Sequence, residues 1–90
     1  MRLDRYLFFI RLLKSRTQAQ ALLDEGRTRI DGRRVEKVAE AVRVGATITL
    51  PLRGNVRVIR VLALPARRGP PNEARVCYAE LGVDEESGAA

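Results

Sequence analysis

The chain begins with an apolar pattern of helical period, which predicts a helix over residues 3–13. Apolar side chains recur there at three- and four-residue spacing, and they are Leu3, Tyr6, Leu7, Ile10 and Leu13. Asp4 falls in the first turn, where the helix dipole favours a carboxylate. We expect Tyr6 in the core, whereas Phe8 and Phe9 lie off the buried stripe and suit the lip of the core.

A second helix is predicted from residue 15 onward. Ser15 can cap its first turn, and Gln18, three residues later, can reach back to form a capping box. The apolar face that follows consists of Ala19, Leu22 and Leu23. Gly26 suits the left-handed position that ends a helix.

The next segment predicts a hairpin with an arginine face. Thr28 and Ile30 alternate with Arg27 and Arg29, so one face points inward and the other is basic. Asp31-Gly32 is the dipeptide of a type I′ turn, and the chain continues beyond it as Arg33, Arg34 and Val35.

A second hairpin is predicted further along, with strands at 47–52 and 56–64 joined across 53–55. Pro51 indicates that the first of these strands lies at an edge of the sheet or has a bulge, because proline lacks the N–H for a sheet hydrogen bond. Between the two hairpins runs a connection that we expect to be anchored by Val38, Val42 and Val44.

The C-terminal part is less regular. Residues 65–72 hold three prolines and a glycine and predict a mobile loop. Residues 73–81 fit a helix or a strand; Asn72 as a cap and Glu73 in the first turn favour the helix. Residues 82–90 are acidic and poor in apolar side chains, which predicts a flexible tail. The fold class is therefore α+β, with two N-terminal helices packed on a short antiparallel sheet and a short C-terminal helix.

The net charge and its distribution along the chain indicate what kind of ligand the protein binds. The 90 residues carry 17 Lys and Arg against 11 Asp and Glu, a net charge of +6, and 15 of the 17 basic residues are arginine. Residues 1–70 have a net charge of +10, and residues 71–90 one of −4. Guanidinium groups present a planar fork of donors that matches phosphate, so a basic body of this kind indicates an anion-binding surface.

Composition also excludes several classes of protein. Cys77 is the single cysteine and histidine is absent, so a disulfide within the chain, a Cys/His zinc site and a histidine-based catalytic triad are all excluded. We expect no enzyme activity, no cofactor and no metal, and a packing role for Cys77. The apolar run of residues 7–10 is too short for a signal peptide or a membrane span, so we expect a cytoplasmic protein.

The N-terminal motifs resemble the S4 RNA-binding domain, named for a small-subunit ribosomal protein. The matching positions are Arg2-Leu3-Asp4, Ser15-Arg16, Ala19, Gly26, Ile30 and Gly32. They cover about residues 1–50, and they imply an S4-like fold (the αL motif) for residues 1–65, with 66–81 as a C-terminal extension. The chain departs from the usual pattern at Phe8, Thr28, Asp31 and Ala46.

Residues 64–81 look like the end of the stand-alone, ribosome-associated heat-shock subgroup of this family. That resemblance implies a non-catalytic monomer that binds ribosomal RNA of the large subunit, in free subunits that carry a stalled peptidyl-transfer RNA. The alternatives are a ribosome assembly factor, an accessory domain of an RNA-modifying enzyme, and a DNA-binding regulator. Aromatic residues make up 4% of the chain, which favours recognition of folded RNA by its backbone.

The predicted RNA-binding residues come from both halves of the basic region. The first group surrounds the start of the second helix and the second lines the first hairpin; together they are Arg2, Arg5, Arg11, Lys14, Ser15, Arg16, Arg27, Arg29, Arg33 and Arg34. Arg16 is expected as an exposed guanidinium without core contacts. Arg11 could instead pair with Asp4 or Asp24, and Arg67 and Arg68 could reach phosphate from their loop.

Overall fold

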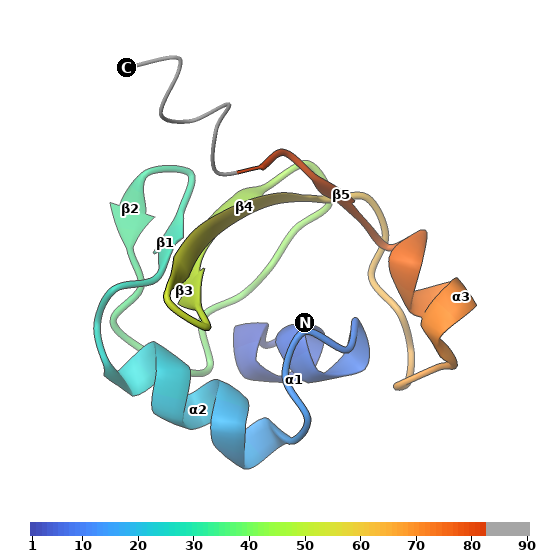
Figure 1. Cartoon of the computed structure of the whole chain (residues 1–90), viewed down its shortest axis with the longest axis horizontal. Coiled ribbons are helices and arrows are strands. Elements are labelled where there is room, and N and C mark those ends of the chain that lie inside the picture. Colours follow the sequence, from blue (N-terminus) through green and yellow to red (C-terminus); the bar gives the residue numbers. More distant parts are fainter. Residues whose placement is uncertain (83–90) are drawn as a thin grey trace.

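The computed structural model describes residues 1–82, and it forms a helical layer against a curved sheet (Figure 1). The elements, in chain order, are α1 (Leu3–Phe9), α2 (Arg16–Asp24), β1 (Arg29–Ile30), β2 (Arg33–Arg34), β3 (Thr47–Leu52), β4 (Asn55–Val61), α3 (Pro71–Arg75) and β5 (Tyr78–Glu80). The five strands are antiparallel in the order β2-β1-β3-β4-β5. The predicted fold class is confirmed, and the predicted tail lies outside the described residues except for Gly82.

The core lies between α1, α2 and the concave side of the sheet (Figure 1). Fully buried side chains come from both layers, and the largest include Tyr6, Leu3, Leu7, Ile10, Ile48, Leu50 and Ile59. Tyr6 also donates its hydroxyl hydrogen bond to the carbonyl oxygen of Cys77, 2.9 Å away. The predicted core roles of Tyr6 and Cys77 are thus confirmed, and Phe8 and Phe9 are half-buried as expected of a lip.

Helix α1 ends at Phe9, earlier than the predicted end at residue 13. Arg11 adopts a left-handed backbone with φ of 67°. Its N–H bonds to the carbonyl of Phe8, and the N–H of Leu12 bonds to the carbonyl of Leu7, which is the Schellman pattern with arginine where glycine is usual. The apolar periodicity continues past this point because Leu12 and Leu13 still pack on the core.

The predicted end and cap of helix α2 are confirmed in part. The Ser15 hydroxyl accepts a hydrogen bond from the N–H of Gln18, and Gly26, with φ of 79°, follows the C-cap. The return bond of a capping box is shifted by one residue, because the Gln18 side-chain oxygen accepts from the N–H of Lys14 and not of Ser15.

Both hairpins form with tight turns. Asp31 and Gly32 both have positive φ, as a type I′ turn requires, and the Asp31 carboxylate accepts a hydrogen bond from the N–H of Thr47. The second hairpin turns at Arg53 and Gly54. The predicted edge position of this strand is wrong, because β3 lies between β1 and β4 in the sheet. Pro51 is tolerated in a central strand because it lies beyond the end of the short β1 pairing, which stops at Thr49.

Three expectations for the second half of the chain are wrong. Val44 is 61% exposed and does not anchor the connection, since the backbone of residues 45 and 46 pairs with Val61 and turns its side chain outward. Residues 73–81 are divided between the end of α3 and strand β5, because the edge of β4 recruits the second part. Asn72 is not the cap of α3, which begins after Pro70.

The C-terminal extension is fastened to the end of α1. The Arg11 guanidinium donates to the carbonyl of Gly69 at 2.6 Å, and the Arg68 guanidinium donates to the carbonyl of Phe8 at 3.1 Å. Arg68 also lies over the Phe8 ring, 4.7 Å from its centroid. Arg68 therefore caps the end of α1, and Gly69 holds the Arg11 side chain. Residues 65–70 form a loop, as predicted, but these contacts tie it to the core instead of leaving it mobile. Among the described residues, no helix is long and apolar enough to cross a membrane.

Candidate nucleic-acid interface

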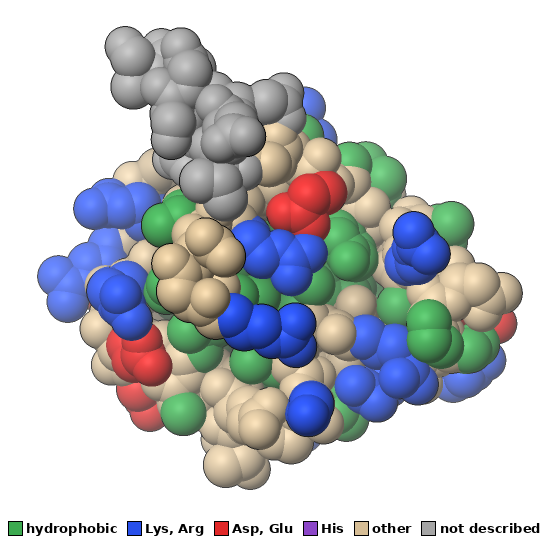
Figure 2. All heavy atoms as spheres, in the orientation of Figure 1, with side chains coloured by type: hydrophobic (Ala, Val, Ile, Leu, Met, Phe, Trp, Pro, Cys, Tyr) green, Lys and Arg blue, Asp and Glu red, His purple; other side chains and the backbone are tan. Residues whose placement is uncertain are grey.

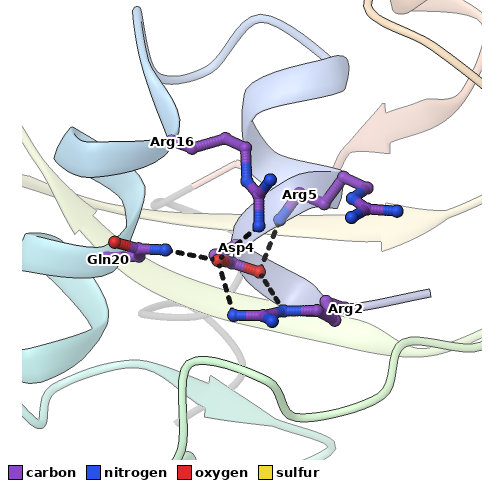
Figure 3. Close-up of polar contacts among 5 residues, drawn as sticks. All are labelled: Arg2, Asp4, Arg5, Arg16 and Gln20. Carbon is purple, nitrogen blue, oxygen red and sulfur yellow. Dashed lines mark hydrogen bonds and ion pairs between the residues drawn. The ribbon is translucent and has the colours of Figure 1, made fainter.

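A buried carboxylate organises the basic residues at the start of the chain (Figure 3). The Asp4 side chain is fully buried. Its two oxygens accept hydrogen bonds from two nitrogens of the Arg2 guanidinium, each at 3.1 Å. The same oxygens accept the Arg5 N–H at 2.8 Å and the Gln20 amide at 2.9 Å. Arg16 completes the set with an ion pair of 3.5 Å. These contacts join the first turn of α1 to α2, because Gln20 and Arg16 both come from α2.

The hydrogen bonds hold Asp4 in its charged form. Burial by itself would raise the pKa of this carboxyl, but the hydrogen bonds from Gln20, Arg2 and the Arg5 backbone outweigh it and lower the pKa below its ordinary value. Asp4 is therefore a carboxylate at neutral pH. One negative charge is shared by two guanidiniums, and the cluster keeps a net positive charge.

The Arg2 and Arg16 side chains stay partly exposed to solvent although they pair with a buried carboxylate. Their side chains are 42% and 39% exposed, respectively. The expectation that Arg16 makes no interior contact is wrong: it pairs with buried Asp4, and its Nε atom is buried with no hydrogen-bond partner in the described part of the chain. Each arginine is thus held at one end and free at the other, which is how a side chain can be ordered before it meets a ligand.

The start of α2 lies beside this cluster. Ser15 occupies the cap position with extended backbone, and its hydroxyl satisfies the N–H of Gln18. Within residues 1–82, no acceptor bonds the N–H groups of Arg16 and Thr17. The Lys14 side chain next to them is exposed. Free N–H groups and the positive end of the helix dipole favour an anion at this position.

Arg5 extends the same surface. Its side chain leaves α1 on the exposed side and points away from Asp4 in Figure 3. We call the set formed by Arg2, Arg5, Lys14, Ser15 and Arg16 the helix-side patch.

Arg11 does not belong to the helix-side patch. Its guanidinium is directed to the carbonyl of Gly69 and pairs with neither Asp4 nor Asp24. The left-handed backbone at this residue sends the side chain toward the C-terminal extension.

The four predicted arginines of the first hairpin form a separate group. Arg27 pairs with Glu25 and Arg33 with Glu40, both at 2.7 Å. Arg29 donates to the carbonyl of Gly32 at 3.1 Å. The Arg34 guanidinium lies against Gly26, where a side chain would come within 3.0 Å of it. Figure 2 shows basic side chains spread widely over one face of the molecule, with few acidic ones between them.

Two members of the cluster were not identified from the sequence. Asp4 was assigned to the helix dipole, to the family motif and as a possible partner of Arg11, but not to the core, although its spacing from Leu3 and Leu7 places it on the buried face of α1. A carboxylate on such a face needs donors, and this was a usable signal. Nothing local indicates Gln20, which is 16 residues away. In residues 1–82, no group of three or more Asp, Glu or Cys side chains is placed to hold a metal ion.

Fold and motif together define the class of protein. The family model described as S4 domain matches residues 1–48, more than half of the chain, and the chain belongs to this family. It is also similar to heat shock protein 15 of Escherichia coli K12, with 32% identity over 86 residues, and to the Haemophilus influenzae homolog, with 36% identity over 81 residues. These alignments cover 96% and 89% of this chain but 64% and 60% of the relatives, so the chain spans less than two thirds of their length.

A solved structure confirms the fold. The structure of Vibrio cholerae heat shock protein 15, described as trimeric, matches with a TM-score of 0.86 at 27% identity. The match covers 99% of this chain and 92% of that one. The resemblance expected from the motifs is therefore confirmed over both halves of the described fold.

Proposed function

We propose that this protein binds folded RNA without catalysing a reaction, and that the helix-side patch is the primary contact. The observation that carries the proposal is the Asp4 cluster. It fixes Arg2 and Arg16 beside the open N-terminus of α2 while leaving both side chains about 40% exposed. An arrangement of ordered arginine forks and free N–H groups is suited to the phosphates of a nucleic acid backbone.

The residues divide the work of binding. Arg2 and Arg16 can each donate two parallel hydrogen bonds to phosphate oxygens from their exposed edges. The N–H groups of Arg16 and Thr17 point along the α2 axis toward the same anion, and Lys14 and Arg5 add charge without fixed geometry. No bond is made or broken. Binding selects one RNA conformation, the one whose phosphates match the fixed guanidiniums.

Folded RNA is a better fit than single strands. Single-strand binders use exposed aromatic platforms, whereas Tyr6 is buried and the Phe8 ring is covered by Arg68. Similarity to heat shock protein 15 and the motif resemblance support ribosomal RNA of the large subunit as the partner. We propose that the relevant form is the free large subunit with a stalled peptidyl-transfer RNA, which serves ribosome rescue and quality control in the cytoplasm.

A sedimentation experiment tests this proposal. Purified large subunits, with and without peptidyl-transfer RNA, and purified small subunits are mixed with the protein and separated on sucrose gradients. We expect co-sedimentation with large subunits, strongest for those that carry peptidyl-transfer RNA. Arg16→Gln should abolish it, and Arg53→Gln, an exposed arginine in the β3–β4 turn, should not. Equal binding to both subunits and to duplex DNA would reject the specific proposal.

We further propose that the protein acts as a monomer. Multi-angle light scattering at several protein concentrations tests this, and a mass of three chains, like the trimer described for the Vibrio cholerae relative, would reject it.

A further inference from the structure

The curved sheet has a second face, directed away from α1. Strand register places Ile48, Leu50 and Ile59 on the concave face, where they are fully buried against the helices. Because side chains alternate along a strand, the positions between them point to the convex side. Cross-strand partners share a face, so the outer face carries both residues of each pair that the core does not use, such as Thr47 with Arg60 and Arg29 with Arg34.

This outer face is basic. Its residues follow from the register, and the polar ones are Arg34 on β2, Arg29 on β1, Thr47 and Thr49 on β3, and Arg60 on β4. All three arginines are exposed. Within the described strands, no Asp or Glu lies on this face, since Glu80 pairs with Ile59 and so shares the inner side.

The arginines of the two faces differ in whether they form an ion pair within the described residues. Arg57 and Arg33 share a face with core residues, and each is paired with a carboxylate, of Glu80 and Glu40 respectively. On the outer face, Arg29 contacts only the carbonyl of Gly32, and in residues 1–82 neither Arg34 nor Arg60 has a carboxylate partner.

Two of these charges also oppose each other directly. Arg29 and Arg34 are partners in the β1–β2 register. Like charges in directly opposed positions destabilise a sheet, and in residues 1–82 neither guanidinium is paired with a carboxylate. If these charges served only to prevent aggregation at the sheet edge, lysines would serve equally well. Arginine differs because its planar guanidinium can donate two hydrogen bonds to a phosphate.

We propose that the outer sheet face, formed by Arg29, Arg34 and Arg60, is a second contact surface for the phosphate backbone of RNA. The inference rests on the proposed function and adds to it. With strands about 4.8 Å apart, Arg29 and Arg60, on strands separated by β3, span about 10 Å. The face thus covers a stretch of backbone, and the protein bridges two segments of a folded RNA, one on each side of the domain.

The test removes two charges from this face and two from elsewhere. The variant is Arg29→Gln/Arg60→Gln, and the matched control is Arg53→Gln/Arg75→Gln, which takes exposed arginines from the β3–β4 turn and from α3. Arg34 is left in place because it packs on Gly26. Binding to purified large-subunit ribosomal RNA is measured by filter retention at salt concentrations from about 0.05 to 0.5 M.

We expect the slope of log affinity against log salt to become shallower by about 1.4–1.8 for the variant, since each of the two phosphate contacts contributes about 0.7–0.9. The corresponding loss of affinity at about 0.1 M salt is roughly 25- to 60-fold. The control should keep the slope of the unmodified protein. Arg29→Lys/Arg60→Lys, which keeps the charge, should restore the slope and so shows that folding is intact.

Three results would overturn the inference. The first is an unchanged slope for Arg29→Gln/Arg60→Gln while Arg16→Gln loses binding, which leaves the proposed function standing. The second is an equal loss for the control pair. The third is a variant Arg29→Gln/Arg60→Gln that still binds RNA but no longer binds a polyglutamate peptide that the unmodified protein binds; this would assign the face to an acidic protein. If Arg16→Gln also binds normally, the proposed function itself fails.

Discussion

Replacing Asp4 with asparagine tests the link between the buried carboxylate and the positions of the two arginines. Asparagine keeps the shape but turns one acceptor oxygen into a donor NH₂ group. If its oxygen still serves Arg2 and the Arg5 N–H, its NH₂ group must face Gln20 and Arg16, which are donors themselves. The change therefore removes the charge and leaves donors opposed to donors.

The magnitude follows from the surroundings of this carboxylate. Removing one partner of a buried ion pair costs about 3–5 kcal/mol. Arg2 and Arg16 are about 40% exposed and can regain water, so we expect a smaller loss of about 2–4 kcal/mol in the free energy of unfolding. For a domain of this size, that corresponds to a fall of about 10–25 °C in Tm. The control, Asp24→Asn on the exposed side of α2, should change stability by less than about 0.5 kcal/mol.

The assay is urea unfolding followed by circular dichroism at pH 7 and at pH 3. The folded state lowers the pKa of Asp4 below its ordinary value of 3.8. Its contribution to stability is therefore complete above that value and is lost as the pH falls through the lower folded-state pKa. The difference between the two proteins should shrink at pH 3. Two results would refute this account. One is a difference in the free energy of unfolding at pH 7 of less than about 0.5 kcal/mol, which is the size expected of a surface mutation; the other is an equal difference at both pH values.

Three further changes test other parts of the structure. Ser15→Ala should lower the free energy of unfolding by about 1 kcal/mol in urea melts, and it should weaken RNA binding less than Arg16→Gln does. Arg11→Gly should be more stable than Arg11→Ala by about 1 kcal/mol, because residue 11 has φ of 67°; equal stability would mean that the turn relaxes. Truncation after Gly82 should leave Tm unchanged and RNA affinity equal or higher in the same assays, since it removes three acidic residues and little apolar surface.

Features set by neighbouring residues could be predicted from the sequence. The start of α2 at Ser15 and the turn at Asp31-Gly32 depend on local backbone and side-chain chemistry. The helix-side patch was also predicted as a group, because its residues flank two adjacent helix starts. For these features the local signals and the tertiary structure agree.

Features set by distant residues were not predicted. The end of α1 at Phe9 depends on Arg68 and Gly69, nearly 60 positions away, and their contacts with residues 8 and 11 leave no local pattern. Residues 78–80 become a strand because β4 offers a free edge. Arg16 was expected to be free because nothing near it in the sequence shows that Asp4 would be buried beside it.

Three hydrogen bonds tie the first helix and Arg11 to the C-terminal extension: Tyr6 to Cys77, Arg11 to Gly69, and Arg68 to Phe8. They bear on how fragments of this family should be cut for experiments. The recognisable motif stops at residue 48, yet the end of its first helix is capped by Arg68, and the buried Tyr6 hydroxyl of the same helix bonds to the carbonyl of Cys77. A fragment cut at the motif boundary would lose most of β3, all of β4, α3 and β5, and both of these contacts. We expect residues 1–48, which the family model covers, to be about half of the unit that unfolds cooperatively. The motif should therefore be transplanted into other proteins together with its C-terminal extension.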